Sequence, residues 1–128
     1  MKPTVATRRS TDQLVHRDSV TETLPAITRF LTDLLGVKLV AHIVDKEPGT
    51  VRRWEKDANT PGDEAERRLR TTAQIARTIL EAGDAGHVVR AWFIGMNPQL
   101  ADEAPADVIR NDRPRDALAA ARAFAGTA

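Results

Sequence analysis

Residues 88–100 read VVRAWFIGMNPQL, and this stretch decides the C-terminal part of the fold. The chain has two tryptophans, three phenylalanines and no tyrosine, and Trp92 and Phe93 stand side by side here. With earlier apolar residues they follow the three- and four-residue intervals of a helix face, which predicts a helix from about Ala85. Gly95 is expected to end this helix. Its predicted inward face comprises Ala85, Val88, Val89, Trp92 and Phe93.

The chain is then expected to turn and to form a short helix. Asn97 precedes Pro98, and a residue before proline is pushed out of the α region, so this pair predicts a turn. Leu100 follows the turn. The short helix is predicted over residues 104–110, with Pro105 at a first-turn position.

A last helix is predicted over residues 114–125, with Leu118, Ala121 and Phe124 at helical spacing. Asn111 is expected to take the left-handed conformation before this helix. Asp112 is expected to cap it.

The order of these parts is similar to a known family. A tryptophan-bearing helix, an Asn-Pro turn, a leucine, a Pro-x-Asp-x-Ile helix and a final helix resemble the toxin-binding domain of the Xre/MbcA/ParS antitoxin family. The resemblance covers roughly residues 84–125. It departs from the family at Asn111-Asp112, where a glycine-containing turn is usual. The resemblance implies a small helical toxin-binding domain over residues 84–128.

Several helices are predicted before residue 84. Residues 1–22 are polar without a sustained period, which predicts a flexible arm. The first helix should begin near Thr23, because an earlier start would bring Pro25 into the helix interior. It should end at Gly36. Its apolar residues are Leu24, Ile27, Leu31 and Leu34, and the second helix, residues 37–44, turns Val37, Val40, Ala41 and Val44 inward.

The third helix is opened by Pro48 and runs to about Lys56. A long fourth helix, with Thr60 as its cap and Pro61 as its first residue, should run to about Ala82 and tie the two halves together. Acid-before-base pairs four residues apart, each contributing ~0.2–0.5 kcal/mol, are expected on its solvated face. These pairs are Asp63/Arg67, Glu64/Arg68 and Glu66/Arg70.

Residues 41–54 resemble the helix-turn-helix of Xre-type repressors at four positions. Small Ala41 lets two helices cross closely, and Asp45 stands at the turn, which needs a residue tolerant of positive φ. Val51 and Trp54 lock the angle between the helices. Asp45 replaces the usual glycine, and Lys46 replaces an expected apolar residue. The resemblance implies an Xre-like helix-turn-helix domain with a long connecting helix over residues 23–83.

The outward side of the third helix carries the candidate DNA contacts. Hydroxyl and amide groups donate to phosphate, and arginine forks match guanine edges. The alternative is an ordinary solvated helix face, because Glu47, Glu55 and Asp57 dilute the positive field. The candidate DNA-binding residues are Lys46, Gly49, Thr50, Arg52, Arg53 and Lys56.

Composition excludes several classes of function. The 128 residues include 19 Lys and Arg, 18 Asp and Glu, and no cysteine, so a disulfide framework and a thiolate metal site are excluded. The three histidines lie far apart in sequence without acidic neighbours at metal-ligand spacing, and no phosphate loop or nucleophile motif is present. No apolar run approaches the ~20 residues of a membrane span. We therefore expect a cytoplasmic protein that is not an enzyme and takes no cofactor or metal.

The family resemblance implies the antitoxin of a type II toxin–antitoxin pair. The toxin would be a RES-domain enzyme that consumes NAD, inhibited when the C-terminal domain covers its active-site entrance. The helix-turn-helix would repress the protein's own operon, as a dimer on a palindrome. The expected toxin contacts are Asn97, Pro98, Arg110, Arg113, Arg115, Phe124, Thr127 and Ala128.

Two other interpretations fit the same residues. The chain could be a stand-alone helix-turn-helix regulator whose C-terminal half only dimerises, which predicts strongly salt-dependent DNA binding and no tight protein partner. It could also be a pure interaction module that no longer binds DNA, as Asp45, Lys46 and the balanced charge permit.

Overall fold

The computed structural model describes residues 22–126, and all regular secondary structure in this range is helical. The predicted all-α class is therefore confirmed. Of the arm predicted for residues 1–22, only Glu22 lies within the described residues. The elements are α3 (Leu24–Leu35), α4 (Val37–Val44), α5 (Pro48–Glu55), α6 (Asp63–Glu81), α7 (Gly86–Ile94), the 3-10 helix η1 (Pro98–Leu100), α8 (Pro105–Arg110) and α9 (Pro114–Gly126).

Local chemistry sets the ends of the first helices. Thr23 Oγ1 caps α3 by accepting a hydrogen bond from the Ala26 backbone N–H at 3.3 Å. Gly36, with φ 91°, ends α3 in a conformation that side-chain-bearing residues rarely adopt. Asp45 ends α4 at φ 61° and ψ 49°, the left-handed conformation expected at this turn. The bounds predicted for the first two helices are confirmed.

The start predicted for the long helix is wrong. α6 begins at Asp63 after Gly62, so Thr60 does not cap it and Pro61 is a buried loop residue. The first turn instead gathers acidic residues, whose charges are favourable beside the positive end of the helix dipole.

The turn between α8 and α9 also differs from the prediction. Asp112 takes the left-handed conformation at φ 62°, whereas Asn111 has φ −91°. The Asp112 carboxylate faces Arg68 across the molecule, 3.2 Å from its Nη2, where a cap of α9 was expected.

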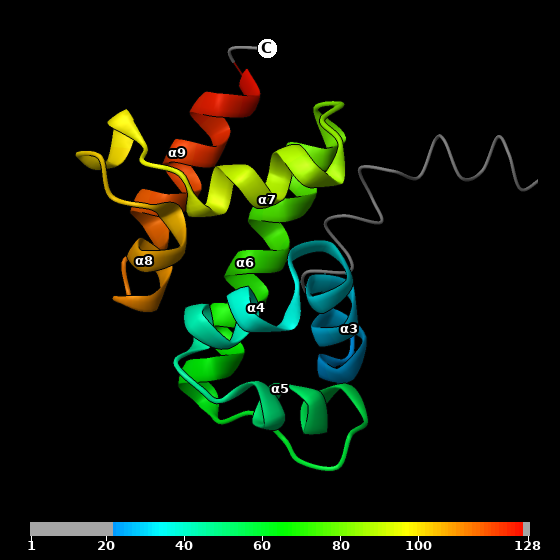
Figure 1. Ribbon diagram of the computed structural model, residues 1–128. Coiled ribbons are helices and arrows are strands. Elements are labelled where there is room, and N and C mark those ends of the chain that lie inside the picture. The colour runs from blue at the N-terminus through cyan, green and yellow to red at the C-terminus, as the bar shows by residue number, and fades with distance from the viewer. Residues whose placement is uncertain (1–21, 127–128) are drawn as a thin grey trace, which may run out of the picture.

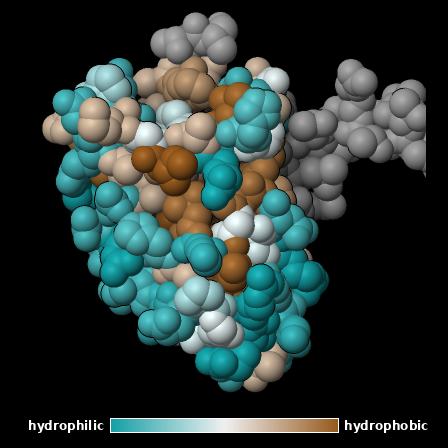
Figure 2. Space-filling view, viewed as in Figure 1, coloured by the Kyte–Doolittle hydropathy of each residue, from teal (hydrophilic) through white to brown (hydrophobic). Residues whose placement is uncertain are grey.

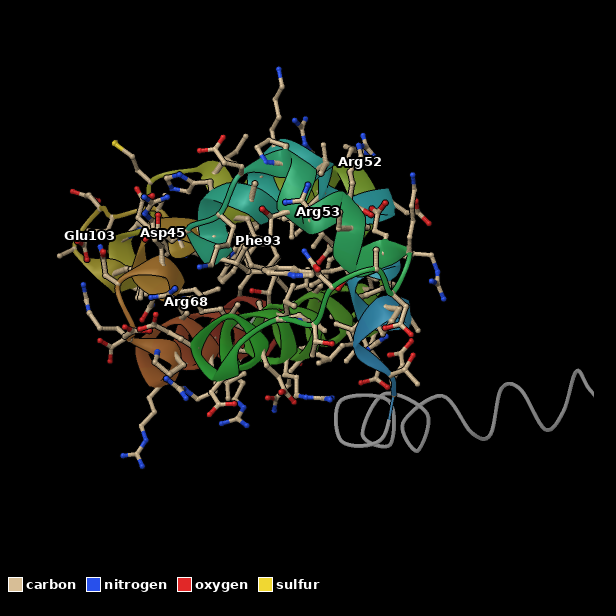
Figure 3. All side chains as sticks on the ribbon, turned by 90° about the horizontal axis from the view of Figure 1, so that it is seen from below. Asp45, Arg52, Arg53, Arg68, Phe93 and Glu103 are labelled. Atoms are coloured by element: carbon tan, nitrogen blue, oxygen red, sulfur yellow. The ribbon has the colours of Figure 1, made fainter. Side chains whose placement is uncertain are left out.

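One continuous cluster of buried apolar residues runs through the N-terminal half, residues 22–83, and the C-terminal half, residues 84–126. α6 passes through the middle of the molecule and contacts α3 and α4 of its own half and α7, α8 and α9 of the other (Figure 1). Phe93 of α7 is fully buried inside this bundle (Figure 3). Ala85, predicted on the inward face of α7, is exposed because it precedes the helix as its N-cap.

α9 packs against α6 mainly through small side chains. Ala117, Ala120 and Ala121 are buried, and the side chains at a contact set how closely two helices approach. Leu118 is only partly buried, and Phe124 is 37% exposed. The buried face of α9 is therefore formed by its alanines. Of the three residues predicted at helical spacing, Ala121 is buried, whereas Leu118 and Phe124 are not.

Arg68 connects the two halves. It exposes only 9% of its surface, although a solvated position was predicted for it. Its Nη1 donates to the Val44 carbonyl at 3.3 Å, and its Nη2 pairs with Asp112. Glu64, its predicted partner, lies 3.6 Å from the same Nη2. The guanidinium is thus held between α4, α6 and the α8–α9 turn.

A second buried arginine, Arg77, binds Glu22, the first residue that the structure describes. Arg77 of α6 pairs with Glu22 at 2.6 Å and lies over the Phe30 ring, 4.3 Å from its centroid. Glu22 therefore belongs to the packed structure and not to an arm.

Because the core is continuous, we expect both halves to unfold in one transition. Trp54 is buried in the N-terminal half and Trp92 in the C-terminal half, so each reports on its own surroundings. In the Trp54→Phe and Trp92→Phe variants, fluorescence of the remaining tryptophan should give the same urea midpoint as far-UV circular dichroism. Adding Phe93→Ala should lower both midpoints together, at a cost of about 3–5 kcal/mol. Two separated transitions would contradict this expectation.

Candidate interaction surfaces

α5 lies at one end of the molecule (Figure 1), and its exposed side, with Lys46 and Lys56 beside it, forms a basic surface. Val51 and Trp54 are buried and hold α5 against α3 and α4, as the sequence predicted. Arg52 and Arg53 lie at the surface when the molecule is viewed from this end (Figure 3). Of the other candidate DNA contacts, Thr50 is half-buried and the rest are exposed, namely Lys46, Gly49 and Lys56.

Short hydrogen bonds hold part of this surface in place. Arg53 Nη2 donates to Thr50 Oγ1 at 3.1 Å, so the guanidinium lies back along the first turn of α5. Arg52 Nη1 lies 3.6 Å from the Glu55 carboxylate. Within residues 22–126, the ammonium groups of Lys46 and Lys56 have no partner in the structure.

Glu55 contributes less acidity to this surface than the sequence suggested. Its side chain is only 15% exposed, and its carboxylate accepts a hydrogen bond from Thr32 Oγ1 of α3. Arg29 Nη1 donates to the Glu55 carbonyl at 2.7 Å. These contacts connect the end of α5 to α3. The exposed acids beside the basic side chains are Glu47, Asp57 and, at the α4–α5 turn, Asp45, which pairs with Arg110.

Arg110, an expected toxin contact, forms hydrogen bonds with other residues of the same chain. Its Nη1 donates to the His42 carbonyl at 2.8 Å, and its Nη2 pairs with Asp45 at 2.8 Å. Nearby, His42 Nε2 lies 2.6 Å from Asp107 Oδ1. These contacts join α8 to α4 and to the α4–α5 turn, so the structure gives Arg110 an internal role that the sequence did not suggest.

Arg113 is also paired, whereas Arg115 is not. Arg113 Nη1 binds Glu103 at 2.5 Å, and its Nε binds Asp116 at 3.1 Å. The hydrogen bond to Glu103, followed by that to Asp116, raises the pKa of Arg113 above its ordinary value. Arg115 is exposed without a partner in the described part of the chain, as is Arg122, which the sequence analysis missed. Arg115 and Arg122 are seven residues apart, which places them on one face of α9. This spacing would have identified Arg122 as a neighbour of Arg115 on that face.

A groove of about 380 Å³ opens between the end of α7, η1 and α9, and we call it the α7–α9 groove. The rings of Trp92 and Phe124 line it, with centroids 6.3 Å apart, and Trp92 Nε1 is buried without an acceptor within residues 22–126. Met96 lines it as well and is 78% exposed. The remaining lining comprises Ala91, Gly95, Asn97, Pro98, Gln99, Ala120 and Ala123.

Apolar side chains gather on the half of the surface that α7 crosses, whereas the end formed by α5 is mostly hydrophilic (Figure 2).

Met96 was missed by the sequence analysis. A large apolar residue directly after Gly95, which ends α7, was the available signal.

The remaining predicted toxin contacts differ in accessibility. Pro98 is exposed at the α7–α9 groove, as predicted for a contact residue. Asn97 is only 9% exposed, and its Oδ1 accepts from the Gln99 backbone N–H at 2.8 Å, which gives it a role in shaping the turn. Thr127 and Ala128 lie outside the described residues.

Within residues 22–126, no group of three or more His, Asp or Glu side chains is arranged to hold a metal ion. None of the described helices combines the length and apolarity that crossing a membrane requires. Comparisons with protein-family models, with curated proteins and with solved structures found no significant match to this chain.

Arg110 and Arg115 allow a matched test of the internal role. Arg110→Met should destabilise the protein by about 1–2 kcal/mol, because Asp45 and the His42 carbonyl lose a charged donor. Arg115→Met, the same change at an arginine without a partner, should stay within about 0.5 kcal/mol of the parent. Urea unfolding followed by far-UV circular dichroism measures both. Equal effects of the two changes would show that the Arg110 contacts contribute no stability.

Proposed function

We propose that this chain is the antitoxin of a type II toxin–antitoxin pair. Its C-terminal half binds and neutralises the toxin, and α5 binds operator DNA, so that the protein represses its own operon. The class of toxin, a RES-domain enzyme that consumes NAD, comes from the family resemblance of residues 84–125. The accessible groups of the two halves support a division into two binding surfaces.

The α7–α9 groove is the observation that carries the proposal. The exposed large hydrophobic side chains in residues 22–126 are Ile94, Met96 and Phe124, all in the C-terminal half, and two of them, Met96 and Phe124, line the groove. Exposed apolar side chains grouped at a groove mark an interaction site. Full burial of a side chain such as Met96 by a partner would contribute about 1.5–3 kcal/mol. A protein partner fits this surface better than a charged ligand, because apolar side chains supply most of its contacts.

The composition of the α5 surface supports the DNA-binding part of the proposal. Arg52 and Arg53 are exposed on consecutive positions, and two lysines without partners flank them. Arginine reads base edges and lysine neutralises phosphates, so this set supplies both kinds of contact. The Glu55 carboxylate is bound by Thr32 of α3, which reduces, without removing, the acidity beside these basic groups.

The two surfaces lie in opposite halves of the molecule, with α5 at one end and the tip of α9 at the other (Figure 1). One chain can therefore hold DNA and a protein partner at the same time. Repression by a dimer on a palindromic operator is compatible with this arrangement, because the α7–α9 groove stays free when α5 enters a major groove.

A second candidate function uses the same groove differently. In a stand-alone regulator, the α7–α9 groove of one chain would receive Met96 and Phe124 of a second copy. This alternative predicts a homodimer that persists without any other protein. It is favoured by the combination of a hollow lined with small residues and large side chains beside it.

Replacing Met96 should decide between these functions. The tagged chain is coexpressed with the product of the adjacent reading frame, purified, and analysed by size-exclusion chromatography and mass identification. Met96→Glu should weaken a toxin complex at least about tenfold, because a carboxylate would be buried in an apolar contact. Ile94→Glu is the matched control, since Ile94 is 54% exposed and does not line the groove.

A RES-domain protein that is retained by the parent and by Ile94→Glu, but lost from Met96→Glu, is the expected result. A parent protein that elutes as a homodimer without partner, and that Met96→Glu converts to a monomer, would replace the antitoxin proposal by the regulator.

DNA binding is tested on the segment upstream of the protein's own gene. Arg52→Ala and Arg53→Ala should each weaken specific binding by about 1–3 kcal/mol, measured by fluorescence anisotropy at fixed salt. Lys56→Ala should instead reduce the slope of log K against log salt by about 0.9, because it removes one phosphate contact. Arg122→Ala, the same charge loss on α9, should leave both quantities unchanged. Unaltered binding by the two α5 arginine variants would mean that α5 does not read the operator.

A further inference from the structure

A second hollow lies between the two halves and shares no lining residue with the α7–α9 groove. We call it the α6–α8 cleft. Its volume of about 500 Å³ falls in the ~300–1,000 Å³ range of small-molecule sites. α6 contributes Arg67, Arg68, Thr71 and Arg70, the last of which pairs with Glu66 at 2.9 Å. The opposite side contributes Ile109, Asp112 and Pro114.

The hydrogen bonds along α6 leave a hydroxyl free at this cleft. Thr72 Oγ1 donates to the Arg68 carbonyl at 2.7 Å, and Thr78 Oγ1 donates to the Gln74 carbonyl at 2.9 Å. This back-bonding to the preceding turn is common for threonine within a helix. Thr71, on the same helix, has no such bond within the described residues. Its hydroxyl is therefore available to a ligand.

Arg67 stands one turn before Thr71 and is free as well. Asp63 lies four residues earlier, but the ion pair predicted between Asp63 and Arg67 is not formed in the structure of residues 22–126. Positions four apart on a helix share a face, so the Arg67 guanidinium and the Thr71 hydroxyl belong to the same side of α6.

Arg68 lines the cleft without offering a donor to it. Its Nη atoms are engaged by Val44 and Asp112, and its Nε is buried away from solvent, without an acceptor in the described part of the chain. Arg68 therefore contributes positive charge to the cleft, which the Asp112 carboxylate at the same wall partly offsets. The cleft thus combines the unused donors of Arg67 and Thr71 with the apolar atoms of Ile109 and Pro114.

We propose that the α6–α8 cleft binds a small organic phosphate. The phosphate would lie at Arg67 and Thr71, and the organic part would lie against Ile109 and Pro114. A phosphate monoester fits because its terminal oxygens can accept from both side chains, and hydrogen bonds between guanidinium and phosphate are charge-assisted. The site goes beyond the proposed function and does not depend on it, since neither toxin nor DNA takes part.

The test titrates the full chain with phenyl phosphate at constant ionic strength, followed by ¹H–¹⁵N NMR. We expect saturable shifts confined to residues 67–71 and 109–114, with a dissociation constant on the order of 1 mM. Inorganic phosphate lacks the apolar part and phenol lacks the anion, so each should bind about tenfold more weakly. Shifts that do not saturate, or inorganic phosphate binding as tightly as phenyl phosphate, would overturn the proposal.

Three variants locate the site. Arg67→Ala should weaken phenyl phosphate binding about tenfold, and Thr71→Val, which keeps the side-chain shape, about threefold. Both positions are at least partly exposed, so the fold is retained. Arg115→Ala removes the same charge from an exposed arginine outside the cleft and should change nothing. Equal weakening by Arg67→Ala and Arg115→Ala would show a general attraction of anions to a cationic chain, and the site would be refuted.

Discussion

A guanidinium removed from water must find acceptors, and Arg68 finds them on two sides of the molecule. The Val44 carbonyl belongs to the N-terminal half, and the Asp112 carboxylate belongs to the C-terminal half. Since neither half alone satisfies the buried cation, α4, α6 and the α8–α9 turn keep fixed distances from one another. Asp112 takes the left-handed conformation that is common just after a helix C-terminus, and it lies beside the α6–α8 cleft.

The α7–α9 groove follows from how α9 is packed. Its inward positions are alanines, which fill the contact with α6 without needing the larger side chains of the same helix. Phe124 is consequently left at the edge of the core, in contact with Trp92 and with water. Met96 is outside because Gly95 ends α7 directly before it. Because the alanines of α9 complete the core, the larger apolar side chains of Met96 and Phe124 remain exposed at the surface.

Local features of the sequence predicted the helices well, because the spacing of apolar residues and the chemistry of Thr23, Gly36 and Asp45 act over a few positions. The exposed residues of α5 could be predicted for the same reason. The roles of the arginines could not be predicted. Arg68 binds groups 24 and 44 residues away, and Arg110 binds His42, 68 residues away. Such pairings depend on the tertiary fold, which periodicity does not reveal.

The α4–α5 turn has an aspartate where a glycine is usual, and a side chain from the far end of the chain holds it. Arg110 donates both to the Asp45 carboxylate and to the His42 carbonyl, so the turn ahead of α5 depends on α8. This limits how such a protein can diversify by recombination. A chain that exchanged its C-terminal half for another would keep a supported turn only if the incoming half brought an arginine to the same place. His42, Asp45 and Arg110 would therefore have to be inherited as one unit across the boundary between the two halves.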